Sequence, residues 1–458
     1  MLLVKRIINC IVFTAFFLSI YNVLEAQENS PYSRYGLGDI YPNQSIASRG
    51  MASLTAAYTD NQALNADNPA TYGDLRSLGN GGLVTFDVGV SIDTRALHSA
   101  NPVEKYKSAY FIPSYILIGF PLSKKHWGMV AGLRPMTRIN YSIESNGRII
   151  DTLQTIYQGS GGLNQAFIGI GKRWGGFSIG VNGGYLFGSK DISTRKVFLN
   201  DSIHYNNSNV DEQQSFNGLY GQIGTQLNIK LATKKDSLSK VSSTYSLRLG
   251  AAGMLKQNLN VASDILNETY TYGSSGVPVP QDTISYHSLV NGKVVLPAMF
   301  NIGVMIVDQE SLLNIATENK WMAGAEMSIG KWGDQYQYPG KSEPLTNSWM
   351  LRGGVQFVPS LFLASGGFLG HTIYRAGFYT GKDYVYADGK DLKVTAFTFG
   401  FGFRTRKFSS YNNQSTVINT AFEIGKRGSN VNNVTENFFK LSIGLSLSDI
   451  WFIKRKYD

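Results

Sequence analysis

Ionisable side chains recur in this chain at alternate positions of otherwise apolar stretches. They are Asp87, Asp93, Lys230, Arg248, Lys256, Glu326, Arg352, Arg404, Glu423 and Lys440. Side chains of a strand alternate between its two faces, so each of these residues shares a face with small or polar neighbours and opposes a row of apolar ones. Carboxylates and cations gathered on one face can form ion pairs that clamp another segment, or line a watery channel. Each can also simply be solvated, and the sequence leaves these three interpretations open.

Residues suited to catalysis or cofactor binding do not form a recognisable motif. The histidines are His98, His126, His204, His287 and His371, and no two have the H-E-x-x-H spacing of a zinc site. Gly340-Lys341-Ser342 resembles the end of a phosphate loop, but Gln335 stands where its first glycine belongs. The sequence therefore predicts no metal, no cofactor and no enzyme activity. A Ser/His site assembled from separate strands remains an open alternative.

The elements that must position these charges are strands. In the stretch 394–404, Phe397, Phe399, Phe401 and Phe403 fall on one side, and Thr398, Gly400, Gly402 and Arg404 fall on the other. The same alternation recurs in segments 84–93, 177–188, 219–230, 245–256, 321–329, 349–357 and 439–447. This pattern predicts an all-β fold, a closed transmembrane antiparallel barrel of about 14 strands with lipid outside. An Arg or Lys facing lipid at the midplane would cost about 2–4 kcal/mol, so we expect the charges to face the lumen.

Composition agrees with an exported membrane barrel. Only 16% of the 458 residues are charged, below the roughly 25% of soluble domains. Lys5 and Arg6 precede an apolar run over 7–20, and Ala26 offers a cleavage point, which predicts a signal peptide over residues 1–26. A membrane anchor is the alternative, although the run is short for a span of about 20 residues. The predicted location is the bacterial outer membrane.

Net charge and domain boundaries complete the prediction. The chain carries a net charge of +10, but its basic residues are spread out, so we predict no nucleic-acid partner. Residues 27–80 alternate poorly and hold apolar and aromatic residues, which favours a hatch folded into the lumen over a disordered tail. Residues 81–448 form the predicted barrel, and residues 449–458 form a short basic tail.

Two short motifs in the predicted hatch carry a family resemblance. Arg49-Gly50-Met51 and Asn68-Pro69-Ala70 resemble the hatch of the FadL/TodX family of outer-membrane transport proteins. The stretches 30–38 and 451–458 resemble a Bacteroidota branch of that family. The resemblance implies a 14-stranded barrel with a hatch and the passage of hydrophobic small molecules. It also implies a side opening at the third strand, predicted near 126–143, where Pro135 would break the ladder. A strand end or bulge at Pro135 with no role in transport is the open alternative.

These observations lead to a ranked set of expectations for function. The first is FadL-like uptake of a hydrophobic small molecule, with outer-membrane lipid and that ligand as partners. The alternative is a non-transporting barrel that serves as a subunit of a larger outer-membrane assembly or secretion complex, motivated by long loops and the basic tail. In that case other outer-membrane or periplasmic proteins are the partners. An outer-membrane enzyme and a soluble β-protein are the third and fourth possibilities.

Overall fold

The computed structural model describes residues 30–451, except 61, 76, 79–80, 101–102, 124–125, 149–151, 200–204, 236–240, 275, 313–315, 341–342, 362–366, 388, 406–414 and 430–431. The predicted signal peptide and residues 452–458 of the predicted tail lie outside the described residues. The predicted tail begins inside a strand, because the last strand continues to Trp451.

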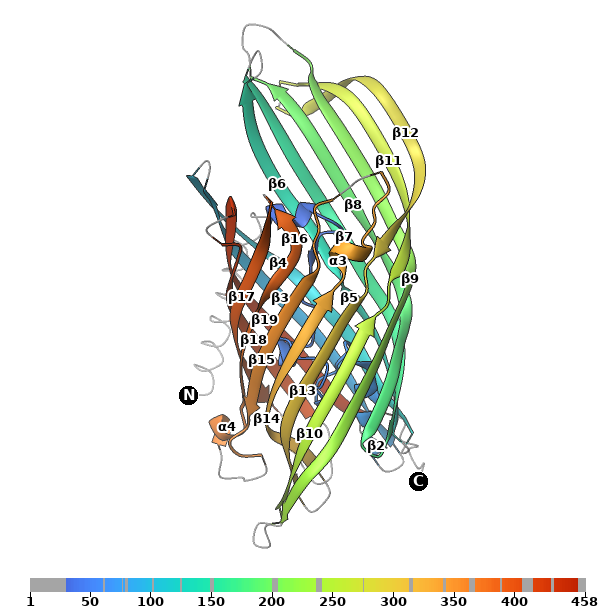
Figure 1. Ribbon diagram of the computed structural model, residues 1–458, viewed down its shortest axis with the longest axis vertical. Helices are drawn as coiled ribbons and strands as arrows, with labels where there is room; N and C mark the ends of the chain where they lie inside the picture. Colours follow the sequence, from blue (N-terminus) through green and yellow to red (C-terminus); the bar gives the residue numbers. More distant parts are fainter. Residues whose placement is uncertain are drawn as a thin grey trace, which may run out of the picture.

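A single antiparallel sheet closes on itself, because the last strand pairs with the first long one (Figure 1). The sheet contains nineteen strands. Its members are β1 (Asp39–Ile40), β2 (Ser77–Leu78), β3 (Gly81–Ala100), β4 (Val103–Ser123), β5 (Trp127–Pro135), β6 (Thr137–Arg148), β7 (Thr152–Trp174), β8 (Phe177–Phe198), β9 (Asn207–Lys235), β10 (Val241–Met254), β11 (Gln257–Tyr272), β12 (Pro278–Leu296), β13 (Met299–Leu312), β14 (Ala316–Gly330), β15 (Ser348–Phe357), β16 (Ile373–Ala387), β17 (Lys390–Arg404), β18 (Ser415–Arg427) and β19 (Val434–Trp451).

Three barrel strands are interrupted rather than continuous. β5 and β6 are separated by Met136, β10 and β11 by two residues, and β12 and β13 by Pro297 and Ala298. Setting aside the two-residue strands β1 and β2, and counting each interrupted strand once, leaves fourteen barrel strands. The predicted fold class and strand number are therefore confirmed.

The two faces of the wall differ as the alternation predicts. On β17, Phe397 and Phe399 are 56% and 49% exposed, whereas Thr398 between them is fully buried. Apolar side chains such as Ile168, Leu219 and Leu351 continue this exposed band around the barrel. Since bilayer lipid is the solvent that such a band requires, the barrel has the outer surface of a membrane-spanning protein.

The wall has unequal height. β7, β8 and β9 have 23, 22 and 29 residues, whereas β15 and β18 have 10 and 13. Figure 1 shows β6 to β9 rising with β11 and β12 above the rest of the barrel. On β8 the outward row changes from Tyr185 and Phe187 to Ser189 and Asp191, so the rising part leaves the apolar band. We call the parts of β9, β11 and β12 within residues 205–217 and 257–292 the projecting sheet.

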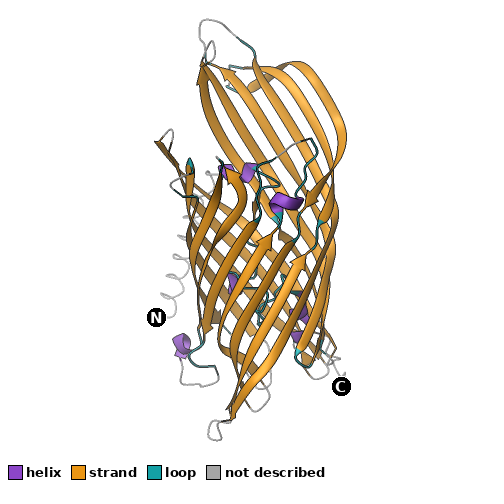
Figure 2. Ribbon diagram, viewed as in Figure 1, coloured by secondary structure: helices purple, strands orange, loops and turns teal. Residues whose placement is uncertain are grey.

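Helices are few and short, as Figure 2 shows. They are the 3-10 helices η1 (Pro31–Arg34) and η2 (Pro69–Asp74) and the α-helices α2 (Ile46–Arg49), α3 (Trp332–Gln335) and α4 (Gly367–Gly370). Among the described residues, no helix has the length and apolar character that a bilayer crossing requires. η1, α2 and η2 belong to the segment that enters the barrel, which contains the candidate site.

Candidate functional site: the closed lumen

The N-terminal segment fills the lumen in two layers. Residues 30–44, which we call the strap, contact the wall near the end from which the projecting sheet rises. Residues 45–75, which we call the hatch, fold around α2 and η2 farther inside, and nearly all of their described side chains are buried. A disordered tail, the alternative considered above, would not bury these residues.

Glycines on the inner face of the wall allow the hatch backbone to approach closely. A Cβ atom at Gly250 would overlap the carbonyl oxygen of Ala56, and one at Gly180 would overlap that of Pro69. Gly377 lies against the backbone nitrogen of Ala52 in the same way. These contacts come from β8, β10 and β16, so they constrain the hatch from separate sides of the barrel.

Glu326 on β14 contacts the hatch through several hydrogen bonds. Its carboxylate accepts hydrogen bonds from the backbone nitrogens of Thr55 at 2.6 Å and Ala56 at 2.7 Å. The hydroxyl of Thr55 donates to it as well. Arg352 on the neighbouring strand lies 3.6 Å away and balances its charge. The buried carboxylate is therefore fully satisfied only while the hatch is in place.

Other wall residues hold the hatch at further points. Asp87 accepts from the backbone nitrogen of Leu64 at 3.1 Å, and Arg248 donates to the carbonyl of Thr59 at 3.1 Å. Arg134 on β5 forms a 2.9 Å ion pair with Asp67 of the hatch. Because β3, β5, β10 and β14 all take part, the hatch is clamped around the barrel rather than hinged along one side.

The predicted hatch motif at Arg49 lies where the barrel closes. Arg49 donates to the hydroxyls of Ser91 at 2.7 Å and Ser442 at 3.1 Å. These two serines are ladder partners on the first and last long strands. The carbonyl of Gly50 accepts from Thr398, and Met51 is fully buried. The structure thus places this motif against the wall, whereas the sequence resemblance had only assigned it to the hatch.

The second predicted motif caps a short helix and contacts another side of the wall. The side-chain oxygen of Asn68 accepts from the backbone nitrogen of Ala70 at 3.1 Å, which caps η2, where Pro69 is the first residue. Its amide nitrogen donates to the carbonyls of Ala56 at 2.6 Å and Thr225 at 3.2 Å. Asn68 therefore joins two parts of the hatch to β9.

The strap is held by a cluster of buried charges. Asp39 pairs with Arg95 at 3.0 Å and with Arg427 at 2.8 Å. Glu436 lies 3.1 Å from Arg95, and Asp383 lies 2.7 Å from Arg427. Burial opposes the charged form of Asp39, but the two guanidinium groups prevail and hold its pKa below the usual value. The carboxylate is therefore ionised at neutral pH and ties the strap to β3 and β18.

The strap also covers the place where the wall strands β4 and β6 are not paired with each other in the described part of the chain. β4 pairs with β5 from Ile116 to Ser123, and no ladder joins β4 to β6 within the described residues. Instead, β6 pairs with β1 of the strap, where Ile40 faces Thr137. Tyr41 packs with Tyr110 and Ile112 of β4. The strap thus closes the side of the barrel at the place where the third strand is broken.

Pro135 lies at this break. β5 ends at Pro135 and β6 begins at Thr137. The carbonyl of Pro135 accepts from the side chain of Asn43 at 3.0 Å, and the carbonyl of Met136 accepts from the backbone nitrogen of Tyr41 at 3.0 Å. Strap groups therefore occupy carbonyls that a continuous β4–β6 ladder would have used.

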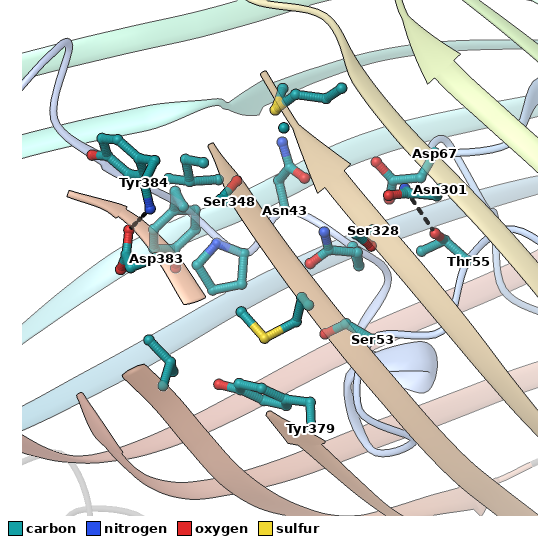
Figure 3. Close-up of a pocket in the computed structure, with 18 of the residues that line it drawn as sticks. Asn43, Ser53, Thr55, Asp67, Asn301, Ser328, Ser348, Tyr379, Asp383 and Tyr384 are labelled. Atoms are coloured by element: carbon teal, nitrogen blue, oxygen red, sulfur yellow. Dashed lines mark hydrogen bonds between the residues drawn. The ribbon is translucent and has the colours of Figure 1, made fainter. Parts of the chain in front are cut away.

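A cavity of about 320 Å³ remains between the strap, the hatch and the wall. Figure 3 shows Asn43 of the strap, Ser53 and Asp67 of the hatch, and Ser328, Tyr379 and Asp383 of the wall around it. Glu326, Arg352, Glu423 and Lys440 also line the cavity, together with methionines such as Met254 and Met299. An apolar ligand would strip water from these charges, so the cavity suits water or a polar molecule.

The structure places most of the predicted lumen charges inside the barrel. Asp87, Asp93, Arg248, Glu326 and Glu423 are buried, and Arg352 and Arg404 are partly covered. Asp93 pairs with Arg95, Arg404 pairs with Glu318, and Glu423 pairs with Lys440. Lys230 differs: its ladder partner Ser246 is buried, but Lys230 itself is exposed near the end of β9. Lys256, at the break between β10 and β11, is exposed as well.

Several functional contacts were missed from the sequence. Arg95 continues the alternation of Asp87 and Asp93 on β3, so extending that pattern would have found it. Arg427 and Glu436 lie just outside the alternating segments that predicted the strands. Asp39 lies in the two-residue strand β1 and Asp67 lies in irregular backbone, and neither setting is long enough or regular enough for periodicity to indicate the direction of a side chain.

The fold and the lumen together define the class: a 14-stranded outer-membrane-type barrel whose lumen is occupied by its own N-terminal segment. The BamG family model matches residues 3–458, and the chain belongs to the BamG family. No curated protein sequence matches the chain.

Solved structures with a similar fold include two toluene transporters and a FadL homologue. The Ralstonia pickettii toluene transporter TbuX has 14% identity and a TM-score of 0.52, over 88% of this chain and 98% of that one. The P. putida toluene transporter TodX has 13% identity and a TM-score of 0.52, over 90% and 99%. A Pseudomonas aeruginosa FadL homologue has 12% identity and a TM-score of 0.52, over 90% and 99%. At these identities the similarity shows the shared fold.

Proposed function

We propose that this protein is a sealed, non-transporting barrel of the bacterial outer membrane that serves as a subunit of a larger assembly. One observation carries the proposal: buried ion pairs and backbone contacts clamp the hatch to several sides of the wall, and the strap closes a second layer above it. Buried charges such as Glu326 and Asp39 are paired in the closed arrangement, and removing one partner of such a pair costs about 3–5 kcal/mol. Opening the lumen would have to break several of these contacts together.

Two further features support the proposal. Charged side chains such as Glu326, Arg352 and Lys440 line the cavity, so a hydrophobic cargo would have to desolvate them in passing. Unequal wall height leaves the projecting sheet above the bilayer, where it is available to other proteins (Figure 1). Membership of the BamG family, rather than of the transporters that share its fold, is consistent with a separate role.

Purification tests this proposal directly. We expect the chromosomally tagged protein, extracted in a mild detergent, to bring down a fixed set of partners at constant stoichiometry. The same protein, once stripped of partners and reconstituted in planar bilayers, should show no steady conductance. A barrel that purifies alone and conducts ions or takes up a hydrophobic probe would contradict the proposal.

A second candidate is the passage of hydrophobic small molecules, as in the transporters with a similar fold. The specific observation in its favour is the break at Pro135, where no ladder joins β4 to β6 in the described part of the chain and β6 pairs with the strap instead. If this is a side opening, the strap must leave β6 before a ligand can pass.

A reversible lock distinguishes this candidate from the first. Ile40 and Thr137 are ladder partners, and a Cys10→Ser background removes the only native cysteine. For a transporter, a disulfide between Ile40→Cys and Thr137→Cys should abolish uptake of radiolabelled toluene or oleate, and reduction should restore it. Uptake that is absent from the unmodified chain, or unaffected by the lock, would reject passage through this opening.

A further inference from the structure

The projecting sheet has an unusual charge for this chain. Residues 205–217 and 257–292 contain five acidic residues and no lysine or arginine, whereas the whole chain has a net charge of +10. The five are Asp211, Glu212, Asp264, Glu268 and Asp282. Arg195 and Lys196 lie beside this sheet on β8, so the acidic surface is confined to β9, β11 and β12. Such a surface repels the phosphates of an outer-membrane lipid surface. It therefore favours a partner that is basic.

Large apolar side chains are exposed within the same sheet. Ile284 is 67% exposed, Tyr286 is 58% exposed and Leu289 is 69% exposed, and all three lie on β12. They stand beyond the level at which the outward rows of β8 and β9 become polar, so lipid does not cover them. A cluster of this kind on a water-exposed sheet marks a protein interaction site.

A β-bulge and a hydrogen bond from its backbone hold Leu289 in this position. Its φ of 53° is in the left-handed region, which costs a non-glycine residue of this type about 1–3 kcal/mol. The carboxylate of Asp264 accepts the backbone N–H of Leu289 at 2.8 Å and so stabilises the turn. The ladder shifts register between Ser263 and Ile265, as expected for a β-bulge that redirects a side chain. A strained backbone that presents a leucine to solvent suggests a function for the leucine.

The backbone of β12 is poorly suited to accept an additional strand. Pro278 and Pro280 lack N–H groups, and the β11–β12 ladder shifts register at three places. Bulges and prolines are the features that protect sheet edges from pairing. Recognition should therefore use the side chains.

We propose that the β11–β12 hairpin docks a protein whose surface has an apolar centre ringed by lysine or arginine. Ile284, Tyr286 and Leu289 form the apolar centre on this chain, and Asp211, Asp264 and Glu268 provide the neighbouring negative charge. The inference rests on the proposed function and deepens it, because it identifies where on the barrel one member of the assembly binds and with what chemistry.

Site-specific photo-crosslinking tests the docking surface in cells. A benzophenone amino acid at Tyr286 should form one adduct of discrete mass, and the same group at Asp191 on β8 should not. Mass spectrometry should place the crosslink in a partner segment rich in Lys or Arg. The Asp211→Lys/Glu268→Lys variant and 0.5 M salt should each lower the yield at least tenfold, since the attraction is electrostatic.

Leu289→Asn separates binding from folding. Asparagine tolerates the left-handed backbone better than leucine, so the hairpin should remain intact while the apolar contact is lost. We expect the crosslink at Tyr286 to fall at least tenfold in this variant, with the heat-modified gel mobility of the barrel unchanged. Retention of the adduct in both variants, an adduct with lipopolysaccharide or a second copy of this chain, or no adduct at all would each overturn the inference.

The two proposals fail in different ways. If stoichiometric partners still co-purify with the unmodified chain but Tyr286 forms no adduct, the docking surface is wrong and the assembly role stands. If the unmodified chain purifies alone from mild detergent, the assembly role itself fails.

Discussion

Replacing Glu326 with alanine is expected to convert the closed barrel into one that conducts ions. The change leaves two buried backbone N–H groups of the hatch and the guanidinium of Arg352 without their shared acceptor. Breaking a buried pair costs about 3–5 kcal/mol, which increases the open population by about two to four powers of ten. Planar-bilayer recordings of the Glu326→Ala barrel should show frequent openings, where the unmodified barrel shows a flat baseline.

An exposed ion pair provides the matched control. Lys382 and Asp391 lie 2.9 Å apart, and the side chain of Asp391 is 44% exposed. Such pairs contribute about 0–1 kcal/mol, so Asp391→Asn should leave the baseline flat. A Glu326→Ala barrel that is as silent as this control, with normal folding, would show that Glu326 does not retain the hatch.

Asp39→Ala should release the strap at neutral pH while leaving the hatch in place. The substitution removes the acceptor that ties the strap to both Arg95 and Arg427. A reporter cysteine at Ser33, buried in the closed state, measures the release in a Cys10→Ser background. Modification by a thiol reagent that works across a wide pH range should be about 100-fold faster in Asp39→Ala, whereas Asp191→Ala should not change it.

The same reporter gives the pH dependence. Because the pKa of Asp39 in the folded protein is lowered by the two guanidinium groups, its contribution is present above the unfolded pKa. That contribution is lost as the pH falls through the folded pKa, which lies below the usual value of an aspartate. Strap release in the unmodified chain should therefore appear only in strong acid, and Asp39→Ala should lack this step. A reporter that opens at pH 6, or never opens in acid, would contradict the assignment.

The barrel could be predicted from the sequence because each strand needs apolar side chains on the face that contacts lipid. Phe397, Phe399 and Thr398 sort onto opposite faces through a period of two, and that signal survives without knowledge of neighbouring strands. The alternation of side chains along a strand also predicts the burial of Asp87 and Glu326. It misplaces Lys230, because a position near a strand end can share the inner face and still reach water.

The contacts within the lumen could not be predicted in the same way. The hatch has no regular period, so the sequence does not show that Asp67 meets Arg134 or that Thr55 meets Glu326. Such pairs join residues far apart in the chain, separated by 67 positions for Arg134 and 271 for Glu326. The resemblance to transporters implied a hydrophobic cargo, whereas the charges around the cavity depend on how the whole wall closes and emerge only in the structure.

The position of Arg49 has a consequence for biogenesis. Its guanidinium joins Ser91 and Ser442, so the N-terminal segment spans the seam between the first and last long strands. A hatch hydrogen-bonded to both sides of that seam is difficult to thread into a finished cylinder. We therefore expect the sheet to close around an N-terminal segment that is already in place. Arg49 should then help to align the first and last long strands as the barrel closes.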